Sequence, residues 1–432
     1  MKNIRNVRIL LGIGALLTVL VTATPAAAAS AVKGAGADSP DPLIGAWQTA
    51  VAAPPLSTSV DYSADGSAAG RDQFITNGVD FAVTGIPFTT EELAKLTAAK
   101  KTFVYAPVAG GSLAFVYHLF TPQGQSIKGL QLSGPTLAKI FTGTVTNWND
   151  AEIIAENPGV TLPPKKIIPT VRGQADGATY VATSFFRYSA PAVWKTFMED
   201  PQRGFVDEPR ELFPFFAGVD SRTSSFAIAD VIASTEGSDG RIGYVDNAWA
   251  KKALAGGADI IKVKNAAGSY VAPTPVSTAK TLAAATIDNK NLLTINFGIA
   301  DPTAYPIAMI NYMVIPTSGL SAETGAAMGT FARYGLQKGQ DAAAGIGDPA
   351  LPSAVVTRSL SVVENALPAT PVTTTTTTTT TLPTDVSAND VTNPGSSDNT
   401  LAFTGGPDVG VWLGSGGALF GIGFWLRRRV TR

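Results

Sequence analysis

Short apolar runs alternate with amphipathic segments through residues 32–366. The run FITNGVDFAV predicts a strand near Val79–Val83, and the following TTEELAKLTAA predicts a helix in which Thr89 and Glu92 have the spacing of a capping box. The segment SGPTLAKIFTG predicts another helix, with Ser133 as its N-cap and apolar residues on one face. This alternation of strands and helices indicates an α/β architecture, and the length suffices for two domains of ordinary size.

Two further apolar regions carry glycine-broken loops. The stretch KTFVYAPVAGGSLAFVYHLF contains two β-rich runs, which we expect to be separated at Gly110–Gly111. Further on, KKIIPT predicts a strand, VATSFF predicts a helix, and VRGQADGATY between them is a loop that carries Arg172. Such a loop is a common frame for an anion site, because the N–H groups and the dipole at a helix start favour negative charge. Asp176 in the same loop is unexpected, because its carboxylate opposes a bound anion.

The first 31 residues have the layout of a secretory signal peptide. Three basic residues precede an apolar core that runs from Ile9 to Val21, and small residues follow up to Ala31. The apolar core is short for a membrane span. We therefore predict that the chain is secreted and that residues 1–31 are removed.

A second targeting pattern occupies residues 401–432. The pentapeptide LAFTG is followed by an apolar segment from Val409 to Leu426 and by an arginine-rich tail, an order typical of a membrane span with a cytoplasmic positive cluster. The whole pattern resembles a cell-wall sorting signal of the LAxTG type. The resemblance implies that a sortase cleaves between Thr404 and Gly405 and joins the chain to peptidoglycan. The preceding Thr/Pro-rich residues 367–400 have too few apolar side chains to fold and predict a disordered stalk.

The composition argues against several functions. The chain has 32 Lys and Arg against 33 Asp and Glu, a net charge of −1, so nothing indicates a nucleic acid as partner. It has no cysteine, which excludes a disulfide framework and a thiol nucleophile. The single histidine, His118, lies in the apolar run AFVYHLF and is expected to pack in the core. No catalytic triad, metal cluster or phosphate-loop motif is visible, so we predict no enzymatic activity, no metal and no cofactor.

Several motifs occur in the order of one known family. They are GAGADSPDPLIGAW, DFAVTGIP, LAKIFTGTVTNWND, the strand and arginine loop at 166–177, GRIGYVDNAWA and LQKGQDAAAGIGDPALPSAVV. Together they resemble the phosphate-binding protein of the phosphate ABC transporter, over roughly residues 34–360. The resemblance implies an α/β, two-lobed periplasmic-binding-protein-like fold of type II. It places a ligand cleft between the lobes and two hinge crossings near Ala106–Val108 and Gly243–Val245.

The resemblance also implies which residues bind the ligand. In that family an oxyanion is bound by backbone N–H groups, hydroxyls, one arginine, and one aspartate that accepts the proton of hydrogen phosphate. For Ser67 the alternative is an ordinary turn serine, and for Arg172 it is a salt bridge between the lobes or with an aspartate. The matching positions of this chain are Asp38, Ser39, Ser67, Thr84, Arg172, Asp176, Gly177 and Thr179.

Five positions depart from the family pattern, and two of them are Ser39 for the phenylalanine of GAGATFP and Ala178 for a threonine of RSDGSGTT. Asp38 stands for a threonine of GAGATFP, Gly85 for the aspartate of ASDAP, and Asp176 for a serine of RSDGSGTT. At ~4 Å and an effective dielectric constant of ~20, each like-charge contact costs on the order of 4 kcal/mol, so two new carboxylates disfavour phosphate as the family binds it. Two interpretations remain open. Asp176 is the N-cap of the next helix and pairs with Arg172 as an internal anion, or one of the two aspartates accepts a hydrogen bond from a ligand hydroxyl.

Two functions fit these observations. The first is a cell-wall-attached solute-binding protein that binds phosphate or a related oxyanion for uptake, with an ABC permease as a further partner. The alternative is a wall-displayed protein for adhesion or sensing, with a degenerate or repurposed pocket. The retained Ser67, Arg172 and Gly177 favour the first function, whereas the glycine at position 85 favours the second. A phosphate-ester hydrolase has no identifiable nucleophile or metal set in this chain.

Overall fold

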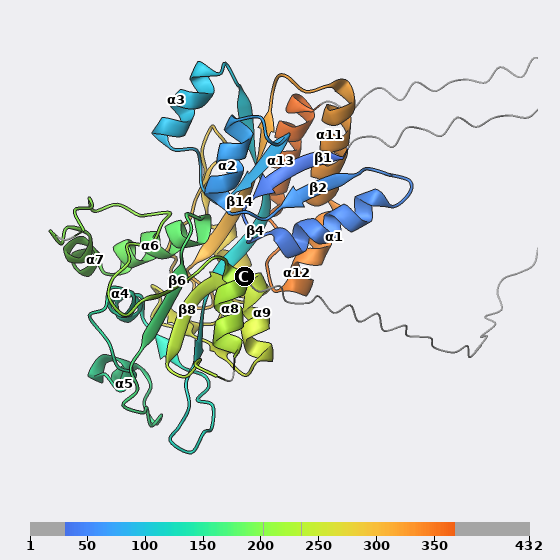
Figure 1. Cartoon of the computed structure of the whole chain (residues 1–432). Coiled ribbons are helices and arrows are strands. Elements are labelled where there is room, and N and C mark those ends of the chain that lie inside the picture. The colour runs from blue at the N-terminus through green and yellow to red at the C-terminus, as the bar shows by residue number, and fades with distance from the viewer. Residues whose placement is uncertain (1–30, 202, 235, 368–432) are drawn as a thin grey trace, which may run out of the picture. The chain divides into compact units, whose positions relative to one another are not determined.

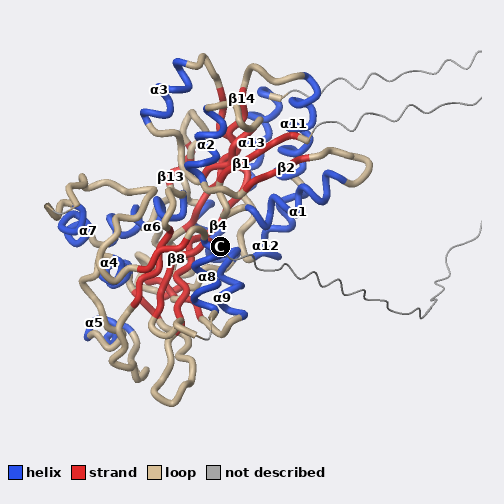
Figure 2. Tube along the Cα trace, viewed as in Figure 1, coloured by secondary structure: helices blue, strands red, loops and turns tan. Residues whose placement is uncertain are grey.

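The computed structural model describes residues 31–367 except 202 and 235. Within these residues, nine strands form one sheet with the order β2-β1-β3-β14-β4-β8-β6-β7, and β9 also pairs with β4 (Figure 2). The α/β fold class predicted from the sequence is confirmed. The strands are β1 (Val32–Gly36), β2 (Val60–Ser63), β3 (Phe81–Thr84), β4 (Phe103–His118), β6 (Ile168–Arg172), β7 (Asp220–Arg222), β8 (Arg241–Asp246), β9 (Asp259–Ile260) and β14 (Ala308–Pro316).

The two parts of this sheet, each with its own helices, form two lobes (Figure 1). The first lobe contains β1, β2, β3, β14 and the first part of β4. Its helices are α1 (Asp41–Ala52), α2 (Ser67–Ile75), α3 (Thr90–Ala98), α11 (Ala322–Leu336), α12 (Ala343–Ile346) and α13 (Ser353–Ala366), with a 3-10 turn at Lys338–Ala342. The second lobe contains the rest of β4 with β6, β7, β8 and β9. Its helices are α4 (Gly134–Phe141), α5 (Ala151–Glu156), α6 (Gly177–Ser189), α7 (Pro191–Met198), α8 (Ser225–Ala233) and α9 (Asn247–Ala255).

Three smaller features complete the described chain. A small sheet has the order β11-β10-β5, and a two-stranded hairpin pairs β12 with β13. Helix α10 precedes that hairpin, and its Leu282 is buried in the core of the first lobe. The bounds are β5 (Gln131–Leu132), β10 (Lys262–Lys264), β11 (Tyr270–Val271), α10 (Pro275–Ala283), β12 (Thr286–Ile287) and β13 (Leu293–Thr294).

Strand β4 is the first connection between the lobes. It is one continuous strand of 16 residues, so the predicted break at Gly110–Gly111 is wrong. These two glycines stay in the ladder, paired with Ile310 and Met309 of β14. A Cβ at Gly110 would lie 2.6 Å from Leu282, so the glycine there permits close packing rather than a turn.

The second crossing differs from the expectation. Gly243–Val245 lies in β8, which pairs antiparallel with β4 on one side and parallel with β6 on the other, and therefore belongs inside the second lobe. The strand that crosses between the lobes beside β4 is instead β14, which pairs with β4 from Ser112 back to Phe103. Ala106–Val108 lies in the part of β4 beside β14, and the partner of β4 changes to β8 at Leu113.

Several local predictions from the sequence are confirmed. Thr89 and Glu92 form the reciprocal capping box at the start of α3, and the Ser133 side chain caps α4 by accepting the N–H of Thr136. His118 is buried, with its Nδ1 3.0 Å from the backbone oxygen of Ile232, and burial lowers its pKa. It is a packed core residue, as its apolar surroundings in the sequence predicted.

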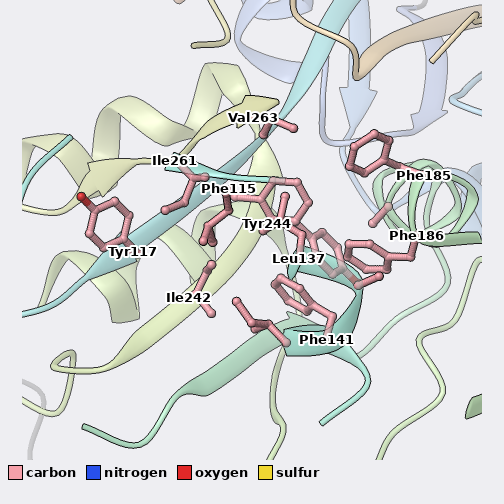
Figure 3. Close-up of a cluster of buried hydrophobic side chains, with 14 of the residues drawn as sticks. Phe115, Tyr117, Leu137, Phe141, Phe185, Phe186, Ile242, Tyr244, Ile261 and Val263 are labelled. Carbon is pink, nitrogen blue, oxygen red and sulfur yellow. The ribbon is translucent and has the colours of Figure 1, made fainter. Parts of the chain in front are cut away.

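The core of the second lobe fixes α6 against the sheet (Figure 3). Phe115 of β4, Phe141 of α4, Phe186 of α6 and Tyr244 of β8 come together there, and all four are buried. The ring centroids of Phe141 and Phe186 are 5.2 Å apart, and those of Phe141 and Tyr244 are 5.7 Å apart. This packing positions the first turn of α6 at the carboxyl ends of β6 and β8.

Segments from both ends of the described chain pack together in the first lobe. Trp47 of α1 packs edge-on against Phe331 of α11 and donates its indole N–H to the backbone oxygen of Gly339 at 2.9 Å. A Cβ on Gly335 would lie 2.8 Å from the indole ring, so the helix backbone meets the tryptophan directly. Trp47 is thus a packing residue of the first lobe.

Among the described residues, no helix combines the length and the apolar character that crossing a membrane requires. The predicted signal peptide at 1–31 lies outside the described residues except for Ala31. The sorting signal at 401–432 and its apolar segment also lie outside them, as does the stalk except for Leu367. Helix α13 ends at Ala366, where the sequence predicted the end of the folded part.

We expect Trp47→Phe to lower the free energy of unfolding by about 1–3 kcal/mol, because it removes a buried hydrogen bond and leaves part of a cavity. Urea unfolding followed by circular dichroism measures the change. The control is Leu254→Ala at a side chain that is 41% exposed, which should change stability by less than about 0.5 kcal/mol. Equal effects of the two substitutions would contradict the role assigned to Trp47.

Candidate functional site

Four chain segments converge at the carboxyl ends of parallel strands. In the first lobe β1 and β3 are parallel neighbours, and in the second lobe β6 and β8 are parallel neighbours. Parallel neighbours bring their carboxyl ends, and the helices that follow, to the same edge of a sheet. Asp38 follows β1, Gly85 follows β3, Arg172 ends β6 and Asp246 ends β8.

Arg172 is the cation of this site. It is 1% exposed, and its Nη1 donates to Oδ2 of Asp38 in a salt bridge that joins the two lobes. Its Nη2 lies 3.9 Å from Oδ2 of Asp176. Its Nε has no hydrogen-bond partner within the described residues. A guanidinium removed from water requires such charged partners, because burial of an unpaired charge is costly.

Asp176 is the N-cap of α6, as one of the two interpretations of the sequence proposed. Its Oδ1 accepts the N–H of Ala178 at 2.9 Å, in the usual manner of an N-cap. Its Oδ2 accepts the N–H of Ser67, the first residue of α2, at 3.0 Å. One carboxylate therefore bonds to the first turns of two helices that belong to different lobes.

The Ser67 hydroxyl makes a second link between the lobes. Its Oγ accepts the N–H of Gly85 at 3.1 Å and that of Gly177 at 3.4 Å. The two glycines also touch, since a Cβ on Gly85 would lie 3.2 Å from Cα of Gly177. An aspartate at position 85, as in the related family, would force the backbone at Gly177 to shift by a few tenths of an ångström. Glycine at this position therefore allows the lobes to meet.

The ionisation of the two aspartates beside Arg172 differs. Burial and, to a smaller extent, the charge of Asp176 raise the pKa of Asp38 to about 6, against the opposing charge and hydrogen bond of Arg172. Burial also disfavours the ionised form of Asp176. Arg172 and the N–H groups of Ser67, Ala178 and Gly177 outweigh that effect, so the pKa of Asp176 is lowered. At neutral pH Asp176 is ionised, and Asp38, with a pKa of about 6, is mostly ionised as well, so two carboxylates share the guanidinium of Arg172.

A third buried aspartate lies behind Asp38. Ser225, the first residue of α8, donates its N–H to Oδ2 of Asp38 at 3.3 Å and its hydroxyl to Oδ2 of Asp246 at 2.7 Å. Burial raises the pKa of Asp246 to about 7, and the charges of Asp38 and Asp176 contribute to the rise. Burial raises the pKa of Asp348 well above its ordinary value, and the charge of Asp246 adds to the rise. The site thus contains more carboxyl groups than cations and stores protons on some of them.

The remaining predicted site residues are buried near this centre but have other partners. Ser39 accepts the amide N–H of Asn311 at 3.3 Å. The Thr84 hydroxyl donates to the backbone oxygen of Ile86 at 2.7 Å. The hydroxyl of Thr179 lies 2.9 Å from that of Tyr244. Of the eight predicted positions, the structure brings Asp38, Ser67, Arg172, Asp176 and Gly177 into direct contact with one another.

A further salt bridge between the lobes lies outside the predicted set. Arg71 of α2 is 1% exposed and donates to Glu92 of the first lobe at 3.0 Å. It also donates to Glu211 of the second lobe at 2.7 Å. The backbone oxygen of Glu211 in turn accepts the N–H of Asp176 at 3.0 Å. This salt bridge therefore supports the loop that carries Asp176.

A groove of about 400 Å³ runs along the line where the lobes meet. Gly85 and Pro87 line it from the first lobe, Tyr180 and Ser184 of α6 from the second, and Phe297 from the segment that follows the β12–β13 hairpin. Since Gly85 also touches Gly177, the groove ends beside the buried centre. Opening the lobes would connect the two.

The sequence reasoning missed Ser225, Asp246 and Arg71. Asp246 had a usable signal, because it ends a predicted strand within GRIGYVDNAWA, and ligands bind at such strand ends. Ser225 and Arg71 had none, since each acquires its role only through packing against a distant segment. Among the described residues, no group of acidic or histidine side chains has the arrangement of a metal site.

Comparisons with known proteins agree with this architecture. A family model for the PBP superfamily domain matches residues 21–337. The phosphate-binding protein PstS of Xylella fastidiosa is 30% identical over 312 residues, covering 72% of this chain and 78% of that protein. The phosphate-binding protein PstS2 of Mycobacterium bovis is 28% identical over 317 residues, covering 72% of this chain and 80% of that protein.

Comparison with solved structures also finds phosphate-binding proteins. A solved phosphate-binding protein from Stenotrophomonas maltophilia superposes with a TM-score of 0.60 at 18% identity, over 78% of this chain and 96% of that one. The chain belongs to the PBP superfamily, and its fold is the mixed α/β, periplasmic-binding-protein-like fold of the phosphate-binding proteins. Its relatives are named for a ligand and not for a reaction, which agrees with a binding protein rather than an enzyme.

The buried carboxyl groups predict a fall in stability with rising pH. The folded state raises the pKa of Asp246 from an ordinary value of about 3.9 to about 7, so it binds the proton more tightly than the unfolded state does. Stability is therefore greatest below about pH 4 as far as this group is concerned, and decreases as the pH rises to about 7.

We expect Asp246→Asn to reduce this decrease by on the order of 3 kcal/mol, because the amide cannot ionise. The free energy of unfolding in urea at pH 5 and at pH 8 tests it. The control is Asp230→Asn, at a carboxylate that is 56% exposed and pairs with Lys252. An unchanged pH dependence in Asp246→Asn would show that Asp246 is ionised at both pH values.

Proposed function

We propose that this chain is an extracytoplasmic solute-binding protein of the phosphate-binding type, which binds phosphate or a related oxyanion between its two lobes for uptake. The single observation that carries the proposal is the buried Arg172 at the end of β6, surrounded by N–H donors from the first turns of α2 and α6. The N–H groups at helix starts of both lobes, together with one guanidinium, are donors that suit a bound anion. The names of the relatives indicate which anion.

The chemistry of the site is suited to a protonated oxyanion. Arg172 keeps its Nε free to donate to a ligand oxygen. Asp38 keeps its Oδ1 free to accept a ligand hydroxyl, because only its Oδ2 has partners among the described residues. Asp38 would then perform the proton-accepting role for which the related family uses an aspartate at position 85. Separation of the lobes about β4 and β14 would admit the ligand, and their closure would remove it from water.

Cell-wall attachment is part of the proposal. The order of LAFTG, apolar segment and arginine tail at 401–432 supports it, with sortase and peptidoglycan as the partners. Residues 367–404, when fully extended, reach up to roughly 120 Å. This length limits the reach of an attached binding domain, which argues weakly against movement to a membrane permease, whereas uptake requires an ABC permease as partner.

The first test is calorimetric titration of residues 32–366 with phosphate and with sulfate at millimolar concentrations. We expect phosphate to bind, and Arg172→Gln to weaken binding at least tenfold, because the substitution removes the cation of the site. The matched control is Arg187→Gln, since that arginine is 47% exposed and pairs with Asp207. Phosphate binding that is unchanged in Arg172→Gln would contradict this assignment of the site.

The second test concerns attachment. We expect Thr404→Ala to release the protein from the wall fraction, because sortase joins the threonine carboxyl to the wall. The measurement is the amount that remains in walls boiled in detergent and then digested with a muramidase. Thr400→Ala, four residues earlier in the same segment, serves as the control. Equal retention of both variants would exclude attachment at Thr404.

One observation favours the second candidate function, a wall-displayed protein whose pocket no longer serves transport. The Asp176 carboxylate already bonds to N–H groups that an oxyanion would use. Failure of the wild type and of every site variant to bind an oxyanion would support display over uptake.

A further inference from the structure

We propose that Asp176 occupies the anion position of this site and is its specificity-determining residue: the lobes close on the chain's own carboxylate, and a free oxyanion binds only by displacing it. The inference rests on the proposed function, because it assumes that the site around Arg172 is the one that binds anions. It adds the group that decides how tightly they bind.

The contacts of Asp176 are those of a bound anion. Its two oxygens accept N–H groups from the first turns of α6 and α2, at 2.9 Å from Ala178 and 3.0 Å from Ser67. Its Oδ2 faces the guanidinium of Arg172, 3.9 Å from Nη2. Asp176 is itself 1% exposed, so water does not compete for these donors. An ordinary N-cap uses only the N–H groups of its own helix, whereas this one also bonds to the other lobe.

The surroundings of Asp176 show lobes that close without a ligand. Gly85 and Gly177 are in backbone contact, so no ligand atom fits between these segments. The hydroxyl of Ser67 accepts both of their N–H groups, at 3.1 and 3.4 Å, in the way that a ligand oxygen would. Arg71 adds a salt bridge across the lobes to Glu211, whose backbone oxygen accepts the N–H of Asp176.

Competition follows from this arrangement. A carboxylate fixed in the same chain acts at a high effective concentration, so an external anion must displace it at a cost in affinity. If both anions stay in the site, the like charges repel each other in a poorly hydrated environment. Either way, removing the charge of Asp176 increases the affinity for phosphate.

The experiment compares the wild type with Asp176→Ser in residues 32–366. Serine keeps a side-chain cap for α6 and removes the competing charge together with its hydrogen bond to the N–H of Ser67. We expect phosphate to bind at least tenfold more tightly to Asp176→Ser than to the wild type. The double variant Asp176→Ser with Arg172→Gln should lose this gain. Asp230→Ser, at a 56% exposed carboxylate, is the control for the loss of one negative charge.

A structural readout accompanies the titration. Hydrogen exchange without ligand should be faster at the amides of Ser67 and Gly177 in Asp176→Ser, because the carboxylate that joins the lobes is gone. Their exchange should slow again when phosphate is added to this variant. Asp176→Asn, which keeps the shape of the side chain, provides the same comparison if the serine variant does not fold.

The outcomes separate the two proposals. Equal or weaker phosphate binding by the Asp176 variants, together with Arg172-dependent binding by the wild type, would overturn this inference and leave the proposed function intact. Absence of phosphate and sulfate binding in the wild type and all variants would overturn the proposed function. In that case, exchange at Ser67 and Gly177 that is unchanged in Asp176→Ser would also show that the carboxylate does not close the lobes.

Discussion

The buried guanidinium of Arg172 is the interaction on which the site depends. A guanidinium removed from water must be paired, and removal of one partner of a buried pair leaves an uncompensated charge. Asp38 comes from the first lobe and Asp176 from the second, so the pairing requires both lobes. Closure of the lobes therefore adds the Asp38 carboxylate to a guanidinium that already has Asp176 beside it in its own lobe.

The fold supplies the partners through its strand ends. The strands of the two lobes run in opposite directions, so the carboxyl ends of β1 in the first lobe and of β6 and β8 in the second meet between the lobes. Asp38, Arg172 and Asp246 lie at these strand ends, and the helices that follow add N–H donors. The cost is an excess of acidic groups in a small buried volume. A proton on Asp246 offsets part of that excess near neutral pH, because its pKa rises to about 7, whereas Asp38, with a pKa of about 6, gains a proton only in mildly acidic solution. The region between the lobes thus combines a buried arginine and the N–H donors of two helix starts with carboxyl groups whose pKa values lie near neutral pH.

Membership of the PBP superfamily explains the frame but not the use of the site. The relatives named as phosphate-binding proteins share the fold over most of both chains. Asp176 and Gly85 together form a closed contact between the lobes, in which a carboxylate of the chain takes the donors and a glycine allows the approach. Whether the chain takes up solute depends on how easily that contact opens.

The sequence was sufficient for the α/β class, the helix caps at Thr89 and Ser133 and the core position of His118, because each depends on neighbours close in the chain or on a motif. It also yielded Asp176 as a helix cap. The prediction of the second crossing at residues of β8 was wrong, because strand pairing is non-local. The predicted break in β4 at its two glycines was also wrong, because glycine marks close packing as well as turns. The contact of Asp176 with Ser67, the approach of Gly85 to Gly177 and the Arg71–Glu211 salt bridge join segments 92 to 140 residues apart. Only the packed lobes bring such groups within bonding distance.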